Sequence, residues 1–134
     1  MDTLELTVRN GDRVVTDLTV EVERFVAGRG DGLVNVFAPH ATAGLALIEV
    51  GAGSDADLAR TLAAILPRDD DRYHHRHGAE GHGADHVLPA LVSPSLSVPV
   101  LGGHLALGTW QSIVLVDTNG DNPHRTVRLS FLTG

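Results

Sequence analysis

The chain has 134 residues, a net charge of −7 and no cysteine, and its ten basic residues are all arginines. The negative charge argues against binding to nucleic acid or to an anionic membrane, because no basic stripe or tail is present to contact phosphates. The lack of cysteine excludes disulfides, zinc ribbons and thiol nucleophiles, and the lack of lysine excludes Schiff-base chemistry and a P-loop.

Length and hydropathy predict a single domain over residues 1–134 with a core of aliphatic side chains. Hydrophobic residues make up 43% of the chain and aromatic residues only 4%, so Val, Leu, Ile and Ala have to fill the core. No apolar run reaches the roughly 18 residues of a membrane-spanning helix, and the N-terminal sequence lacks a signal-peptide pattern. We therefore expect a cytoplasmic protein.

The first half of the chain predicts strands around one helix. Alternating apolar residues indicate a strand at 4–9, and a second strand begins at 14 after a turn. Mostly apolar runs indicate further strands at 33–38 and 45–50. The stretch 17–27 fits either a strand or a helix. A helix is favoured because Val26 completes an apolar face behind a Thr16 or Asp17 cap.

The second half predicts two helices and four strands, which makes the fold class α+β. A helix is expected from Ser54 to Pro67, followed by a polar loop over 68–83 and a short helix over 84–91. Pro89 would be tolerated only within the opening turn of that short helix. Strands are expected at 96–100, 105–110, 113–116 and 126–132.

Eight histidines are the main candidates for function, and five of them lie between Tyr73 and His86. Imidazole transfers protons near neutral pH and binds borderline transition metals, and three neutral imidazoles with one water would make a catalytic metal site. His77 and His82 are interpreted as solvated loop residues. Two histidines nearer the C-terminus, His104 and His124, are interpreted as a turn residue and as a surface residue or anion contact.

Four residues within or beside the apolar segments are further candidates for the site. His40 stands between two strands, where it projects into a site or bonds a neighbouring carbonyl. Glu49 ends the second strand, and a carboxylate there is costly unless it is paired, ligating or exposed. Trp110 is interpreted as core packing, whereas the adjacent Gln111 amide would require a hydrogen-bond partner.

Taken together, these residues form an ordered set of motifs. H-x-T-A-x-L-x-x-x-E is followed by Y-x-H, by a histidine that opens a helix, and by P-V-x-x-G-x-L-x-L-G-T-W-Q. This order, from about residue 17 to residue 134, resembles the YjbQ family of secondary thiamine-phosphate synthase enzymes. The matching residues are His40, Thr42, Ala43, Glu49, Tyr73, His75, His86, Pro99, Gly103, Leu105, Leu107, Gly108, Thr109, Trp110 and Gln111.

The resemblance implies a fold, an assembly and a site. The fold would be two packed, largely antiparallel β-sheets with two or three helices, assembled as a homotrimer or hexamer with the pocket close to a subunit boundary. His40, His75 and His86 would converge to hold a divalent metal ion, zinc or magnesium, with Glu49 as a catalytic or orienting carboxylate. The substrate-binding residues would be Thr42, Tyr73, Trp110 and Gln111.

The implied reaction joins a pyrimidine pyrophosphate to a thiazole phosphate and releases pyrophosphate. Two alternatives stay open: a metal-dependent hydrolase of a small ester or phosphoester, and a non-catalytic oligomeric protein that binds a small anion. The chain departs from the family pattern at Ala41, where a hydroxyl residue is usual, and at Asp85 before His86. His74, His75 and His77 compete for the Y-x-H position, and His75 is favoured.

Overall fold

The protein folds into two antiparallel sheets and three α-helices in a computed structural model, which describes residues 1–75 and 78–134. The larger sheet has the order β1 (Asp2–Arg9), β8 (His124–Thr133), β3 (Gly32–Phe37), β5 (Ser95–Leu101) and β6 (His104–Leu105). The smaller sheet has the order β2 (Val15–Asp17), β7 (Ser112–Asp117) and β4 (Ala43–Ile48). The helices are α1 (Thr19–Val26), α2 (Ser54–Ile65) and α3 (His82–Leu91), with a short 3-10 helix at Asp70–Arg72. The expected α+β fold is confirmed, and no helix in the described part of the chain is long and apolar enough to cross a membrane.

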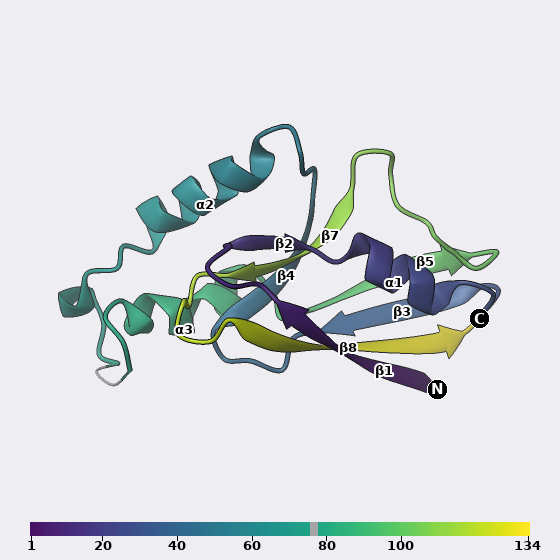
Figure 1. Cartoon of the computed structure of the whole chain (residues 1–134), viewed down its shortest axis with the longest axis horizontal. Helices are drawn as coiled ribbons and strands as arrows, with labels where there is room; N and C mark the ends of the chain where they lie inside the picture. The colour runs from purple at the N-terminus through teal and green to yellow at the C-terminus, as the bar shows by residue number, and fades with distance from the viewer. Residues whose placement is uncertain (76–77) are drawn as a thin grey trace.

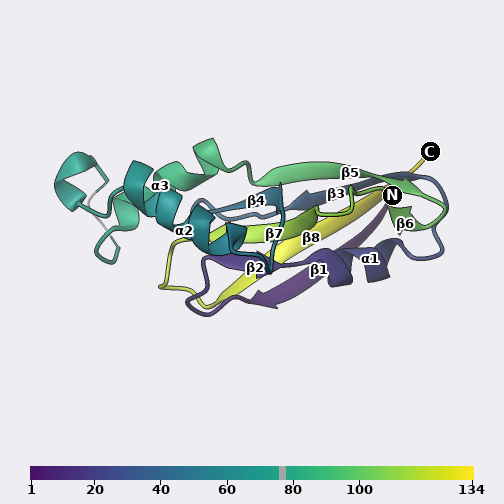
Figure 2. The same cartoon turned by 90° about the horizontal axis from the view of Figure 1, so that it is seen from above.

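β7, the central strand of the smaller sheet, is buried on both faces, and its sequence shows why. Ile113 and Leu115 pack against the larger sheet, whereas Val114 and Val116 pack against α2 and α3. Successive strand residues point to opposite faces, so a continuous apolar run places apolar side chains on both faces of the sheet. Figure 1 shows α2 on one side of the smaller sheet and β1, β3 and β8 on the other, and Figure 2 shows the same elements from above.

The region predicted as ambiguous, residues 17–27, contains α1 as favoured. Val22, Phe25 and Val26 form its buried face. The N-cap is Leu18 rather than Thr16 or Asp17, although the Asp17 carboxylate accepts a hydrogen bond from the Thr19 backbone N–H at 2.9 Å. The side-chain oxygen of Asp17 therefore still satisfies a backbone donor at the start of the helix.

The short helix over 84–91 begins earlier than predicted, at His82, so Pro89 lies beyond its opening turn. Gly81 precedes the helix with a positive φ of 82°, a conformation that suits glycine. Proline at position 89 removes one backbone donor, which would otherwise face the Asp85 carbonyl. This lost hydrogen bond affects only the last turn of the helix, which ends two residues later at Leu91. The fully buried Leu88 side chain holds that turn against the core.

The strand predicted over 105–110 is wrong beyond Leu105. His104 and Leu105 pair with β5, and the Ala106 N–H still bonds the Pro99 carbonyl of that strand at 2.9 Å. A turn follows in which the Gln111 side-chain oxygen accepts the Gly108 N–H at 2.8 Å. The Gln111 N–H also bonds the Gly108 carbonyl at 3.1 Å. Trp110 is consequently not core packing: 73% of its surface is exposed.

Antiparallel pairing gives the smaller sheet two distinct ends. Ala43 lies opposite Asp117 at one end, and Ile48 lies opposite Ser112 at the other. Residues just before β4 and just after β7 therefore share one end, and residues just after β4 and just before β7 share the opposite end. This register decides which of the candidate residues can meet within one chain.

Candidate metal centre

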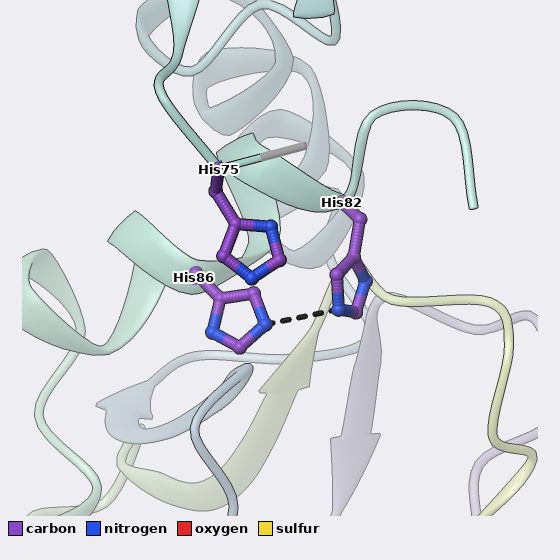
Figure 3. A group of neighbouring side chains, drawn as sticks. All are labelled: His75, His82 and His86. Carbon is purple, nitrogen blue, oxygen red and sulfur yellow. Dashed lines mark hydrogen bonds between the residues drawn. The ribbon is translucent and has the colours of Figure 1, made fainter. Parts of the chain in front are cut away.

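Three histidines, His75, His82 and His86, meet beside α3, and we call them the histidine trio. Each offers one ring nitrogen, and these nitrogens all lie within 4.8 Å of one another. The Nε2 atoms of His82 and His86 are 2.9 Å apart, and the ring centroids of His75 and His86 are 4.2 Å apart in a stacked arrangement. Figure 3 shows the three rings turned toward a common region. All three side chains are partly buried.

Helix geometry explains why two of the three imidazoles meet. His82 and His86 are four residues apart, and side chains at that spacing lie on the same helix face. His75 comes from the segment that follows the 3-10 helix and reaches the pair from outside α3. The trio thus combines one helix with one neighbouring segment.

Tyr73 and Gly83 hold the His75 segment against α3. A Cβ atom on Gly83 would lie only 2.7 Å from the Tyr73 Cβ, so glycine permits the close approach of the two elements. The Tyr73 hydroxyl donates a hydrogen bond to the Pro67 carbonyl at 2.7 Å. Tyr73, expected to bind substrate, therefore has its hydroxyl engaged by the protein backbone.

The spacing of the trio is close to that of a tetrahedral zinc site. Two nitrogens bound to zinc at about 2.0–2.1 Å and a tetrahedral angle lie about 3.3–3.4 Å apart. The 2.9 Å separation of the His82 and His86 Nε2 atoms is near this value. A spacing of up to 4.8 Å for the remaining pairs requires a small side-chain movement rather than a change of fold.

A buried carboxylate, Asp85, anchors α3, the helix that carries His82 and His86. Asp85 is 1% exposed and accepts hydrogen bonds from Arg68 at 2.5 and 3.1 Å and from the Thr118 hydroxyl at 2.7 Å. The Asp85 carboxylate raises the pKa of Arg68 above its ordinary value through this hydrogen bond. Because a buried charge is costly unless it is paired, this contact fixes the rotation of α3 and thus the direction of its histidines.

His40, expected as the third metal ligand, does not belong to the trio. Its Nε2 lies 3.0 Å from both the backbone nitrogen and the carbonyl oxygen of Thr126 on β8. The pKa of His40 is lowered below its ordinary value of 6.5, mainly by burial and to a lesser extent by the nearby positive charge of Arg125. The alternative in which His40 bonds the neighbouring backbone is the arrangement present.

A buried polar network surrounds Thr42, which was expected to bind substrate. The Thr42 hydroxyl accepts a hydrogen bond from Arg125 at 2.9 Å, and Arg125 is paired with Asp117 at 2.5 and 3.1 Å. Asn10 also donates to Asp117, at 2.8 Å. Thr42 is only 5% exposed, so its hydroxyl serves the network at this end of the smaller sheet.

Glu49, Trp110 and Gln111 lie at the other end of the smaller sheet. Glu49 directly follows β4 and Gln111 directly precedes β7, both next to the pair Ile48–Ser112. The trio lies toward the opposite end, where Asp121, four residues after β7, approaches His82. Within one chain, the structure does not bring these three predicted site residues to the histidines.

His82 corrects the sequence interpretation, because it was taken as a solvated loop residue. Its spacing of four residues from His86 was the available signal, but the helix was predicted to begin at residue 84. His74 is exposed and His75 joins the trio, which supports His75 in the Y-x-H position. His77 lies outside the described residues.

Sequence comparison relates this chain to proteins of one family. The family model described as "UPF0047 protein YjbQ-like" matches residues 4–134. A UPF0047 protein of Mycobacterium tuberculosis is 63% identical over 134 residues, which cover 100% of both chains. A UPF0047 protein of Archaeoglobus fulgidus is 35% identical over 125 residues, covering 92% of this chain and 97% of the relative.

Solved structures agree with this relationship. The crystal structure of a hypothetical protein from Aeropyrum pernix has a TM-score of 0.84 at 30% identity and covers 100% of both chains. That of a conserved hypothetical protein from Thermus thermophilus has a TM-score of 0.84 at 32% identity, covering 96% of this chain and 99% of the other. The chain therefore belongs to the YjbQ-like UPF0047 family.

Proposed function

We propose that the histidine trio binds a divalent transition metal ion and that the protein is an enzyme that uses it to hydrolyse a small phosphorylated ester. The observation that carries this proposal is the convergence of three partly buried imidazoles, two of them with Nε2 atoms 2.9 Å apart. Three imidazoles leave one coordination position open in a tetrahedral site, as catalytic zinc sites require.

The donor set selects among metals. Imidazole suits zinc and its neighbours, whereas magnesium prefers carboxylate, carbonyl and water oxygens. Of the two ions expected from the resemblance, zinc therefore fits the trio and magnesium does not. When bound, such an ion would supply a Lewis acid that lowers the pKa of water and stabilises negative charge on a phosphoryl oxygen.

The chain's own residues prepare the site for that chemistry. The Asp85–Arg68 pair fixes α3, and Gly83 lets the Tyr73–His75 segment lie against the helix. Ligands held by a rigid scaffold lose little conformational entropy on binding, which favours a site formed before the metal arrives.

Thiamine-phosphate synthase-type transfer is the second candidate, and the motif resemblance favours it. The departing pyrophosphate would be neutralised by the same ion. In this candidate, Glu49, Trp110 and Gln111 would have to reach the trio from a neighbouring subunit, because the register separates them within one chain. We therefore propose an oligomer with the site near a subunit boundary, and the motif resemblance favours a homotrimer or hexamer. We also propose that the protein acts in the cytoplasm.

Zinc binding by single-histidine variants tests the metal site. We expect one zinc per chain in calorimetric titration of the metal-free protein, and at least a tenfold loss of affinity for His75→Ala, His82→Ala and His86→Ala. His74→Ala is the matched control, because it removes an adjacent but exposed imidazole. Zinc affinities that do not distinguish these variants from the control would refute the site.

Activity assays then separate the reaction classes. Zinc-loaded protein should release phosphate from small phosphomonoesters, and the His86→Ala variant should not. Thiamine phosphate formation from the two phosphorylated precursors would favour the transferase instead. Zinc binding without either reaction would favour the third possibility, a non-catalytic anion-binding protein, which predicts ligand-dependent stabilisation only.

A further inference from the structure

We infer that Asp121, in the loop between β7 and β8, is a positioning residue that orients the His82 imidazole. Its consequence for metal binding rests on the proposed function, whereas the orientation itself does not. Asp121 belongs to none of the motifs that the sequence singled out. Its Oδ2 lies 3.9 Å from His82 Nδ1, and it is half-exposed whereas the His82 side chain is 15% exposed.

The two ring nitrogens of His82 face different partners. Nε2 faces His86 at 2.9 Å, and Nδ1 faces the Asp121 carboxylate. A carboxylate beside Nδ1 stabilises the tautomer with the proton on Nδ1, which leaves the Nε2 lone pair available to the trio. Metal-binding histidines commonly donate their second N–H to such a carboxylate, which fixes the ring and increases its basicity.

The loop that carries Asp121 is anchored to the core of the fold. The Asn119 side-chain oxygen accepts the Asp121 backbone N–H at 3.1 Å, and the Asn119 N–H bonds Asp117 at 2.9 Å. Asp117 in turn is paired with the buried Arg125. Asn119 itself is 7% exposed, so the backbone of this loop is held by a buried network rather than by solvent contacts.

The same loop is also tied to α3, which carries His82. The Thr118 hydroxyl donates to Asp85 at 2.7 Å, and Arg68 donates to the Thr118 carbonyl at 3.2 Å as well as to Asp85. Loop and helix are therefore joined through Thr118 and Asp85, each three residues from a member of the Asp121–His82 pair. A carboxylate held in this way needs to move only about 1 Å to form a charge-assisted hydrogen bond with the imidazole.

The orientation is tested in metal-free protein by the ¹⁵N chemical shifts of the His82 ring at pH 8, where an ordinary imidazole is neutral. We expect the Nδ1–H tautomer to predominate in the wild type and to decrease in Asp121→Ala. Asp121→Asn keeps an acceptor oxygen and should retain most of it. Asp57→Ala is the control, because it removes an exposed carboxylate of equal charge from α2.

Zinc titration of the same proteins tests the consequence. Affinity should fall about tenfold or more in Asp121→Ala, less in Asp121→Asn, and not in Asp57→Ala. Unchanged tautomers together with affinities equal to the Asp57→Ala control would overturn the inference. A wild type that binds no zinc at the trio, but whose His82 tautomer depends on Asp121, would refute the proposed function and leave the positioning role supported.

Discussion

At the scale of single residues, the partners of the ring nitrogens decide what each histidine does. His40 directs Nε2 to the Thr126 backbone, whereas the Nε2 atoms of His82 and His86 face each other. One residue type thus has two roles: His40 bonds the backbone of a strand, whereas His82 and His86 form part of a candidate metal site. The family resemblance favoured His40 as a ligand, and only the three-dimensional contacts separate the two roles.

His40 should make the folded state sensitive to mild acid. Its pKa is lowered from 6.5 by burial and by Arg125, so the unfolded chain binds a proton first as the pH falls. The stability that neutral His40 provides is therefore complete above about pH 6.5 and is lost as the pH falls toward the lowered pKa. Thermal unfolding at pH 7.5 and 5.5 measures the effect.

His40→Gln is the matched variant, because its amide oxygen can still accept the Thr126 N–H. We expect a smaller decrease in Tm between pH 7.5 and 5.5 for this variant than for the wild type. Equal decreases in the two proteins would show that His40 does not contribute to the acid sensitivity.

At the scale of elements, α3 connects the candidate site to the core. The Leu88 side chain of α3 is fully buried in the cluster that contains Val114 and Val116 of β7, and Asp85 bonds Arg68 and Thr118. His82 and His86 lie on the same helix as these anchors. Changes in how α3 packs should therefore alter both stability and metal binding.

Leu88→Ala should lower the free energy of unfolding by about 3 kcal/mol, because it opens a cavity at a fully buried position. Leu91→Ala, in the last turn of the same helix, removes an identical side chain that is 58% exposed and should change stability by less than about 0.5 kcal/mol. Urea denaturation of both variants at one protein concentration measures the difference. Equal losses would mean that α3 is not packed as described.

Gly83→Ala should weaken zinc binding even though alanine favours helix formation by about 1 kcal/mol. The added Cβ would lie 2.7 Å from the Tyr73 Cβ and would push the Tyr73–His75 segment away from α3. Gly120→Ala is the control, because its Cβ would meet no atom within 4 Å. If both variants bind zinc like the wild type, His75 does not depend on this close packing.

At the scale of the whole molecule, local sequence patterns predicted most helices and strands but not which of their residues come into contact. The alternation at 4–9 and the apolar face of 17–27 are local, and both elements formed as predicted. The interpretation of Trp110 as core packing failed because the turn formed by Gly108 and Gln111 ends the strand. The separation of Glu49 from the histidines depends on which strands pair and in which register, and no local periodicity encodes that choice.

The proposed assembly would place the end of the smaller sheet that carries Glu49 and Trp110 against the histidine trio of a neighbouring subunit. Sedimentation should give three or six times the chain mass of 14.1 kDa, and the fluorescence of the sole tryptophan should shift to longer wavelength on dissociation. Trp110 is 73% exposed and Ile65 57% exposed in the single chain. Trp110→Ala should favour smaller species and Ile65→Ala should not; a monomeric wild type would contradict this arrangement.

Anomalous diffraction at the zinc absorption edge, from crystals of the zinc-loaded protein, tests the central claim most directly. The proposed site predicts one peak per chain, about 2.0–2.1 Å from a ring nitrogen of each of His75, His82 and His86. A peak coordinated by His40, or the absence of any peak at the trio in fully loaded protein, would contradict it.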